Sequence, residues 1–358
     1  MRKRINLVLP NCPVSPPIWD SPIGAFWAPM SRLVGVRSVP EDRDERLAYF
    51  GLDHVGHVSE GVLTLSALRV SPPTGCWQFV LSAMSTSSGI ATRQLGPVSE
   101  AEFAEVRKNL PRLNTKSLTV VAGERATHGL VAETKWDFGT TPAPKIEGQS
   151  WQSFLPEGDG EIALRNFIDS GVNLLSELEL NRRREDEGHP PINLLWPWGH
   201  GHAPNLPNLA LLRGEPSPVV TDSLQIEGIA NLVRLRCVPR SEVRRKLPTN
   251  FSRVRTALAG ANTSYVVFET PGEFAIAGQE DELHWWMGQL HDLVFEPMLE
   301  AAFDHALHLT IVFPQTRASL GLLFDSERRA TPGPAFRPEL ADELPGRDLH
   351  ELIRLDQT

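Results

Sequence analysis

Short apolar runs alternate with longer amphipathic stretches along most of the chain. The run INLVL at 5–9 predicts a buried first strand, and DERLAYFG at 44–51 has the spacing of a helix that ends at Gly51. Apolar runs of strand length recur at 192–199, 218–222, 265–270, 307–313 and 320–326. Amphipathic stretches between them predict helices, with long ones at 161–186 and 282–303. This alternation indicates an α/β fold with a largely parallel sheet flanked by helices.

A different pattern occupies residues 65–138. Two strand-like runs joined by the turn SSG at 87–89 predict a β-hairpin, and Ser99 with Glu102 forms a capping-box signature for a helix. Two further strand-like runs, LTVVAGE and HGLVAET, follow that helix. We therefore predict an α+β cap domain at 65–138, inserted into a core built from 1–64 and 139–358. Such a layout favours a pocket near the carboxyl ends of the core strands.

Net charge, apolar run length and cysteine content exclude several classes of function and location. The formal net charge of −9 argues against general nucleic-acid binding, which needs basic patches, but it leaves room for a local cationic pocket. No run approaches the ~18 apolar residues that cross a membrane, and the apolar run near the N-terminus is too short for an export signal. Three cysteines without zinc-site spacing fit a reducing compartment. We expect a cytoplasmic protein that binds neither nucleic acid nor membrane.

Several stretches resemble one known family. They are Phe154 to Leu209, which contains Asn181, WPWG and PNLP, then SPVVTDSLQIEGIANLVRL at 217–235 and LGLLFDS at 320–326. In this order they resemble the archaeal-type cofactor-independent (2,3-bisphosphoglycerate-independent) phosphoglycerate mutases of the alkaline phosphatase superfamily. The resemblance implies an alkaline-phosphatase-like core with an inserted cap. It also implies an enzyme in which two divalent metals such as Mn or Zn activate a Ser or Thr nucleophile for phosphoryl transfer.

This chain has other residues where that family carries its nucleophile and metal ligands. Pro10 follows the first strand in place of a bridging Asp, and Asp42 or Arg43 stands where the nucleophile should open a helix. The other ligand positions fall, by the resemblance, at Gly272, Ile276, Gln315 and Thr316. Such side chains are poor substitutes for the Asp and His ligands of a two-metal site. We therefore expect that the protein uses no metal cofactor.

A few polar residues could still hold a small anion. The residues that the resemblance leaves for this role are Arg43, His128, Asn181, His200 and His202. The motif His200-Gly201-His202 could instead suggest a metal site, but no carboxylate lies at ligand spacing, and a polar loop is the simpler interpretation. The run Arg182-Arg183-Arg184 ends the long helix predicted at 161–186, where we expect a solvated cap.

Two function hypotheses follow. The first is a phosphoglycerate mutase-like protein that has lost the two-metal site and nucleophile. Such a protein would serve binding or assembly, with an unknown protein partner or a small anionic ligand. The alternative is an active mutase or related phosphotransferase with a rebuilt site. The sequence feature that supports this alternative is the set Arg43, His128, His200 and His202. Metal analysis together with a mutase assay separates the two hypotheses.

Overall fold

The chain forms two compact units. A computed structural model describes residues 3–10, 12, 32–36, 43–52, 55–133, 138–214, 217–238, 252–292, 307–313, 319–325 and 346–347. The core unit comprises 1–57 and 206–358, and the inserted unit comprises 58–205. No helix among the described residues combines the length and the apolar character needed to cross a membrane.

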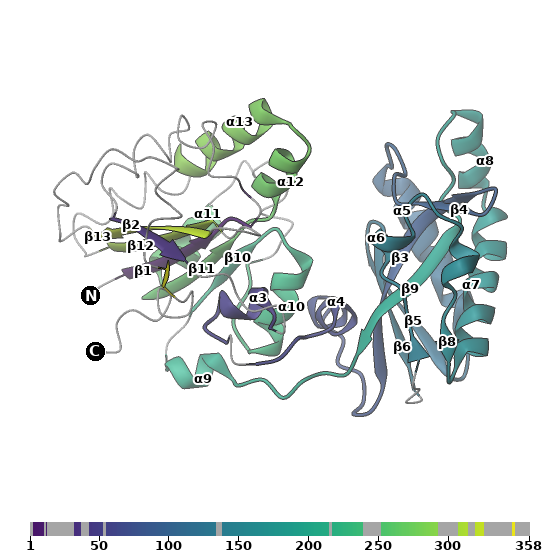
Figure 1. Cartoon of the computed structure of the whole chain (residues 1–358), viewed down its shortest axis with the longest axis horizontal. Helices are drawn as coiled ribbons and strands as arrows, with labels where there is room; N and C mark the ends of the chain where they lie inside the picture. Colours follow the sequence, from purple (N-terminus) through teal and green to yellow (C-terminus); the bar gives the residue numbers. More distant parts are fainter. Residues whose placement is uncertain are drawn as a thin grey trace. The chain divides into compact units, whose positions relative to one another are not determined.

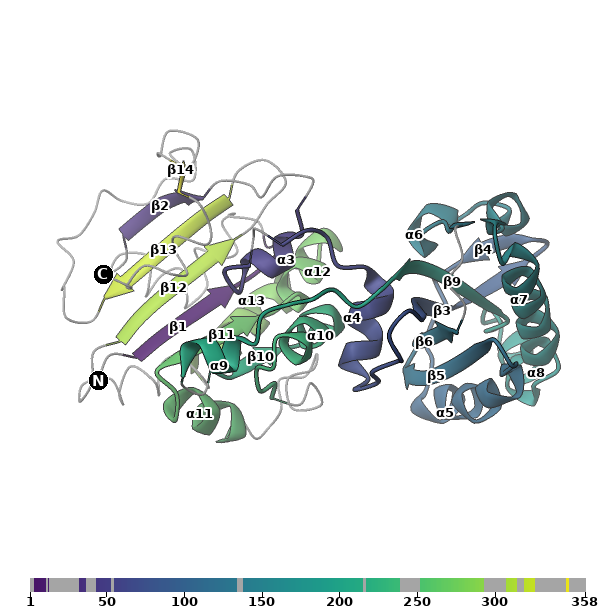
Figure 2. The same ribbon diagram turned by 90° about the horizontal axis from the view of Figure 1, so that it is seen from below.

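The core unit is built on a seven-stranded sheet in the order β10-β11-β1-β12-β13-β2-β14 (Figure 2). These strands are β1 (Lys3–Val8), β2 (Arg32–Val36), β10 (Val219–Thr221), β11 (Thr263–Val267), β12 (Leu307–Phe313), β13 (Ser319–Asp325) and β14 (Gly346–Arg347). Neighbours pair in parallel except at β13, which runs antiparallel to both β12 and β2. The predicted α/β class with a largely parallel sheet is confirmed. Of these seven strands, β13 alone runs in the opposite direction.

Helices cover both faces of this sheet, because residues of one strand point alternately to opposite sides. Tyr265 packs against Phe50 with ring centroids 5.2 Å apart, whereas Phe268, three residues later, packs against Trp286 at 5.0 Å. Figure 1 shows α12 and α13 on one side and α3 and α10 on the other. The helices are α3 (Glu45–Ala48), α9 (Leu209–Arg213), α10 (Leu224–Leu232), α11 (Ser252–Ala259), α12 (Thr270–Ile276) and α13 (Glu280–Leu290). The predicted long helix 282–303 is described only as far as 292.

The inserted unit contains a five-stranded antiparallel sheet in the order β4-β3-β6-β5, with β9 paired to the other edge of β3. Its strands are β3 (Trp77–Ser87), β4 (Ile90–Thr92), β5 (Leu118–Glu124), β6 (Thr127–Ala132) and β9 (Leu194–Gly201). Ser88 and Gly89 turn the predicted hairpin with positive φ values of 51° and 78°. The predicted capping box between Ser99 and Glu102 opens α5 (Glu100–Asn109). Both predictions are confirmed.

The remaining elements of the inserted unit surround this sheet. They are α4 (Glu60–Ala67), η2 (Leu110–Leu113), β7 (Phe138–Gly139), α6 (Ala143–Ile146), η3 (Trp151–Phe154), β8 (Glu157–Gly158), α7 (Glu161–Ser176) and α8 (Glu179–Asp186). The helix predicted as one element at 161–186 is therefore two. Leu178 adopts an extended backbone (φ −69°, ψ 137°) between α7 and α8, which interrupts the helical hydrogen bonding.

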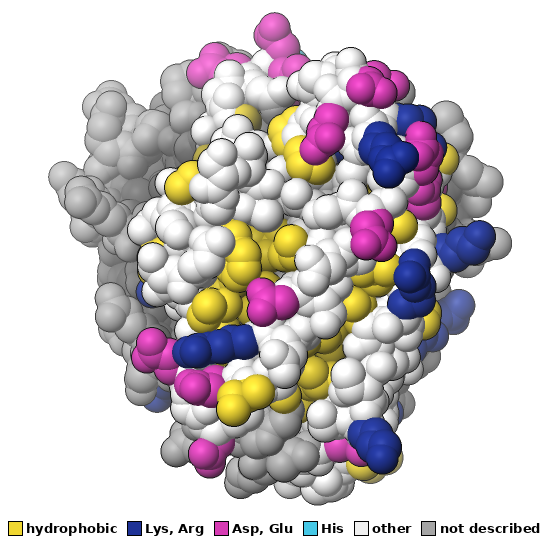
Figure 3. Space-filling model, turned by 90° about the vertical axis from the view of Figure 1, so that its right-hand side faces the viewer, with side chains coloured by type: hydrophobic (Ala, Val, Ile, Leu, Met, Phe, Trp, Pro, Cys, Tyr) yellow, Lys and Arg dark blue, Asp and Glu magenta, His cyan; other side chains and the backbone are white. Residues whose placement is uncertain are grey.

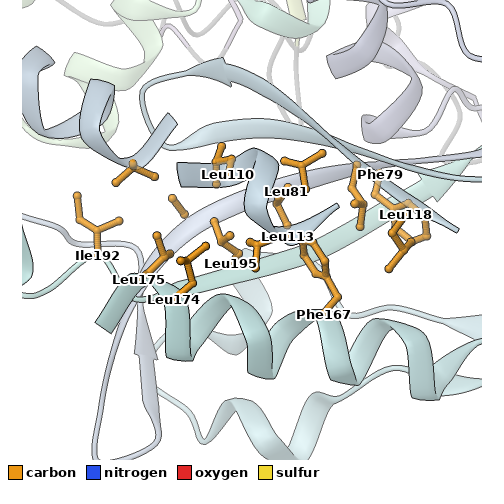
Figure 4. Packing of buried hydrophobic residues seen from close by; sticks show 14 of the residues in the cluster. Phe79, Leu81, Leu110, Leu113, Leu118, Phe167, Leu174, Leu175, Ile192 and Leu195 are labelled. Carbon is orange, nitrogen blue, oxygen red and sulfur yellow. The ribbon is translucent and has the colours of Figure 1, made fainter. Parts of the chain in front are cut away.

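The inserted unit is longer than the predicted segment 65–138, and this boundary needs correction. β9 pairs with β3 over the registers Met84↔Leu194 to Gln78↔Gly201, so a strand assigned to the core completes the sheet of the insert. Phe167 of α7 belongs to the buried hydrophobic cluster that also contains Phe79 and Leu81 of β3 (Figure 4). Because 161–201 supplies one strand and two helices to this buried core, the unit extends to 205.

The three arginines at the end of α8 are not a uniform solvated cap. Arg184 is 1% exposed, and its guanidinium donates hydrogen bonds to the carbonyl oxygens of Pro97, Pro190 and Leu95. It also pairs with Glu102 at 2.8 Å. Although burial opposes it, hydrogen bonds from Ser99 and Arg184 lower the pKa of Glu102 to about 2. Arg184 therefore ties α8 to the loop before α5, and the expectation of a solvated side chain is wrong at this residue.

Candidate functional site

Two acidic residues follow the carboxyl ends of β10 and β11. The two strands are parallel neighbours, paired through Thr221 and Val267, so their carboxyl ends share one edge of the core sheet. The Asp222 carboxylate accepts hydrogen bonds from the backbone N–H groups of Glu269 at 2.8 Å and Thr270 at 3.0 Å. Open α/β sheets bind their ligands at this edge. The two strand ends are thus joined by an acidic side chain at the position where a site is expected.

Asp222 and Glu269 are half-buried, and other acidic groups lie near them. Burial raises the pKa of Glu269 to about 7; a hydrogen bond from Ser223 opposes this shift, and the charges of Asp222 and Glu273 add to it. Burial also raises the pKa of Asp222, despite its hydrogen bonds from Thr270 and Glu269. A carboxyl group that titrates near neutral pH can exchange a proton with a ligand. A negatively charged phosphate ester at this edge would be repelled by the carboxylates.

A third carboxylate lies at the start of α3, the helix at which the resemblance expects a nucleophile. Asp44 is the N-cap of this helix and is 4% exposed. Its Oδ1 accepts hydrogen bonds from the backbone N–H of Arg46 at 3.1 Å and from the Arg46 Nε at 2.8 Å, while Oδ2 accepts from Nη2 at 2.8 Å. His57 Nδ1 lies 3.6 Å from the same Oδ2. This network holds Asp44 as a helix cap.

The predicted ligand positions lie mostly within or beside regular elements. Pro10 is half-buried in the turn after β1. Gly272 is buried in α12, and Ile276 ends that helix with 76% of its surface exposed. Asp42, Gln315 and Thr316 lie outside the residues that the structure describes.

The described residues do not fit a pair of divalent cations. Pro10, Gly272 and Ile276 have no side-chain donor atom, and both carboxylate oxygens of Asp222 and of Asp44 accept hydrogen bonds within the protein. Within the described ranges, no three His, Cys, Asp or Glu side chains gather as metal ligands. A two-metal centre needs several converging carboxylates and imidazoles. No catalytic step through metals can therefore be built on these residues.

Two of the predicted anion-binding residues lie together in the inserted unit. The ring of His202 stacks on Trp77 with centroids 3.9 Å apart, and the His200 ring meets Trp77 edge-on at 4.9 Å. His202 Nδ1 lies 2.9 Å from the carbonyl oxygen of Cys76, so this nitrogen is the donor, while His200 Nδ1 lies 3.0 Å from Thr140 Oγ1. Burial and the neighbouring His202 lower the pKa of His200. His200, which was expected in a loop, therefore lies in β9, and His202 directly follows the last residue of that strand.

His128 and Asn181 have structural partners of their own. His128 is fully buried in β6, and its Nδ1 accepts a hydrogen bond from the backbone N–H of Gly123 at 3.0 Å. Burial and the charge of Arg107 lower the pKa of His128 to about 4, so its ring is neutral at pH 7. Asn181, 2% exposed, exchanges two hydrogen bonds with the backbone of Ile192 and donates a third to the Leu175 carbonyl.

Arg43 belongs to the core unit, whereas the other four predicted anion-binding residues belong to the inserted unit. It is exposed and forms an isolated β-bridge with Gly56. The structure therefore brings His200 and His202 together within one unit, and places His128 and Asn181 in separate hydrogen-bond networks. Anion binding by these five residues stays a prediction.

Sequence reasoning missed Asp44, Asp222 and Glu269. A signal was present for each of them. Asp44 precedes a helical pattern as N-cap residues do, and the other two end or follow apolar runs of strand length. The strand order, which makes β10 and β11 neighbours, could not be read from these local patterns.

No protein-family model matches the chain. Among curated proteins, the 2,3-bisphosphoglycerate-independent phosphoglycerate mutase of Methanothrix thermoacetophila is 27% identical over 197 residues, which are 52% of this chain and 48% of that protein. The enzyme of the same name from Methanosarcina mazei is 28% identical over 210 residues, or 56% and 52% of the two chains. The matched part of the chain thus spans about half the length of these curated relatives.

Solved structures extend the similarity to the whole fold. The cofactor-independent phosphoglycerate mutase from Thermoplasma acidophilum superposes with a TM-score of 0.60 over 99% of this chain and 98% of its own, at 16% identity. A protein from Pyrococcus horikoshii superposes with a TM-score of 0.70 over 99% and 96%, at 13% identity. At these identities the superpositions establish the fold, while the sequence matches establish descent. The chain is a divergent homologue of the archaeal-type 2,3-bisphosphoglycerate-independent phosphoglycerate mutases.

Proposed function

We propose that the protein is a phosphoglycerate mutase-like protein that does not carry out two-metal phosphoryl transfer and instead serves binding or assembly. The residues at the ligand positions that the resemblance assigns support this proposal most strongly. Pro10, Gly272 and Ile276 stand at these positions, and none of them has a side-chain donor atom that could bind a cation. Without cations, neither a nucleophile nor the charge on a transferring phosphoryl group is stabilised.

The electrostatics of the strand ends support the same proposal. Asp222 and Glu269 lie at the edge where a phosphorylated substrate would bind, and the neighbouring Glu273 adds a further negative charge. In an active two-metal site, cations would offset such carboxylates. Without such cations, these carboxylates would repel a phosphate ester.

The three cysteines support the further proposal of a cytoplasmic protein. All three are buried free thiols, as is usual in a reducing compartment. The ligand or partner of the proposed binding function is either a protein or a small anion, and His200 with His202 remains the place to look for the anion.

Metal content and turnover test the proposal together. The full-length protein would be incubated with MnCl₂, ZnCl₂ or CoCl₂, freed of loose metal, and analysed for bound metal. The same samples would then receive 3-phosphoglycerate, with conversion to 2-phosphoglycerate followed by phosphorus NMR. The Methanosarcina mazei enzyme serves as the positive control. We expect no stoichiometric metal and no conversion above a protein-free blank. Stoichiometric metal with measurable turnover would refute the proposal.

A further inference from the structure

The net charge of the protein is confined to one stretch of the chain. Residues 256–316 contain nine Asp and Glu residues and neither Lys nor Arg. Removing these nine from the 44 acidic residues leaves 35, equal to the 35 Lys and Arg of the rest. The entire formal net charge of −9 therefore comes from this stretch, whose described part includes α12 and α13.

The exposed side of α13 combines acidic and apolar side chains. Helical periodicity buries Leu283, Trp286, Met287 and Leu290 against the core unit. The same periodicity places Trp285 one turn after Asp281 and Glu282, on the solvent side. Half of the Trp285 surface is exposed, and Ile276 at the end of the adjoining α12 is 76% exposed. We call Ile276, Glu280, Asp281, Glu282 and Trp285 the α13 surface.

The acidic residues of this surface form no ion pairs within the part of the chain that the structure describes. They are Glu280, Asp281 and Glu282, and all three are exposed. The chain contains the same tripeptide once more, as Glu185-Asp186-Glu187 at the end of α8, directly after three arginines. Figure 3 shows the side that carries α7 and α8, where Lys and Arg alternate with Asp and Glu. The two copies of the tripeptide therefore differ in that only the copy in α8 has arginines next to it in the sequence.

We propose that the α13 surface docks a basic segment of a partner protein. An exposed tryptophan is a strong anchor at protein interfaces, and an arginine of the partner can also stack on its ring. Three neighbouring carboxylates would steer and orient Lys and Arg side chains. The same charges repel nucleic acid and anionic membranes. A symmetric dimer through this surface would place like charges opposite each other, which disfavours a second copy of the chain. The inference does not depend on whether catalysis is lost.

A defined peptide tests this docking. The probe is a fluorescent helical peptide of Arg and Leu, whose binding to the full-length protein is followed by anisotropy. We expect saturable binding that weakens with added salt. A peptide with Glu at each Arg position should not bind. Replacing Glu280, Asp281 and Glu282 by Gln, Asn and Gln should weaken binding at least about tenfold, and Trp285→Ala should do the same.

Matched variants distinguish binding at the α13 surface from unspecific attraction of the peptide to acidic residues anywhere on the protein. The triple change Glu185→Gln, Asp186→Asn and Glu187→Gln removes the identical tripeptide from α8, and Ile162→Ala removes an exposed apolar side chain (70%) from α7. Both variants should bind the Arg/Leu peptide like the native protein. The proposal fails if that peptide does not bind, or if the α8 variant weakens binding as much as the α13 variant. Light scattering that reveals a dimer lost on Trp285→Ala would also overturn it, because a second copy would then be the occupant.

Discussion

The carboxylate of Asp222 lies 2.8 Å from the backbone nitrogen of Glu269 and accepts its hydrogen bond. This contact joins the end of β10 to the residue from which α12 begins. Because the first N–H groups of a helix have no partner within the helix, Asp222 also supplies the acceptor that Thr270 needs. Asp222 therefore has a structural role. In an active site, the same carboxylate would be available to bind a ligand.

Replacing Asp222 should destabilise the core unit. Asp222→Ala leaves two part-buried N–H groups without an acceptor, so we expect the free energy of unfolding to fall by about 2 kcal/mol. Asp222→Asn keeps one acceptor oxygen and should cost less. Urea denaturation measures both. The exposed Asp281→Ala serves as the control and should stay within about 0.5 kcal/mol of the native protein. Equal stability of all three variants would contradict the role given to Asp222.

Glu269 should make stability depend on pH. Its pKa in the folded protein is about 7, whereas the ordinary pKa of a Glu side chain is 4.5, because burial and nearby carboxylates raise it. Between these two values the folded state binds more protons than the unfolded state, so this residue's contribution falls as pH rises. Glu269→Gln removes the effect. Relative to the native protein, the variant should gain stability from pH 5 to pH 8, by at most about 3 kcal/mol. Urea curves that show the same pH dependence for both proteins would contradict this assignment.

The His128 ring should stay neutral at pH values well below 6.5, the ordinary pKa of histidine. Its pKa is about 4, lowered by burial and by Arg107, and its Nδ1 accepts the hydrogen bond of Gly123. The ring proton must then be on Nε2. Nitrogen NMR should find the Nε2–H tautomer at pH 7 and no protonation until about pH 4. Since the unfolded chain protonates this residue near pH 6.5, His128 should reduce stability as pH falls from 6.5 toward 4. A ring that titrates near pH 6.5 in the folded protein would restore His128 as a candidate cation for an anion site.

Asn181 should prove structural. Its amide satisfies the backbone of Ile192 and Leu175 in a buried position. Asn181→Leu leaves these groups without partners, and we expect a loss of about 3 kcal/mol in the stability of the inserted unit. Hydrogen exchange would locate the loss at the amides around Ile192. The exposed Arg182→Leu on the same helix should change little. Unchanged protection in Asn181→Leu would leave ligand binding as the better explanation of this residue.

Local patterns predicted most of the strands correctly. The apolar run that became β1, the hairpin through Ser88 and Gly89, and the capping box at Ser99 each depend on residues close in sequence. The alternation of strand and helix patterns also predicted an α/β core with an inserted α+β unit, and the resemblance to known relatives implied the same architecture. The break between α7 and α8 was missed because Leu178 fits a helical apolar pattern although its backbone is extended.

Features that depend on distant contacts were beyond sequence reasoning. The insert was predicted too short because nothing local to β9 indicates that it pairs with β3. The burial of Arg184 arises from carbonyl oxygens of Leu95, Pro97 and Pro190, which no sequence spacing links to it. Likewise, Asp222 and Glu269 lie next to each other only because β10 and β11 are neighbours in the sheet.

Under our proposal, this homologue lacks the two-metal centre of the phosphoglycerate mutases. A crystal structure of the full chain soaked with MnCl₂ and 3-phosphoglycerate is the decisive test, because anomalous scattering locates manganese. We predict no paired manganese peaks at the carboxyl ends of β1, β10 and β11. Two peaks ~3.5–4 Å apart there, held by carboxylates and imidazoles and bridged by a phosphate, would contradict the claim.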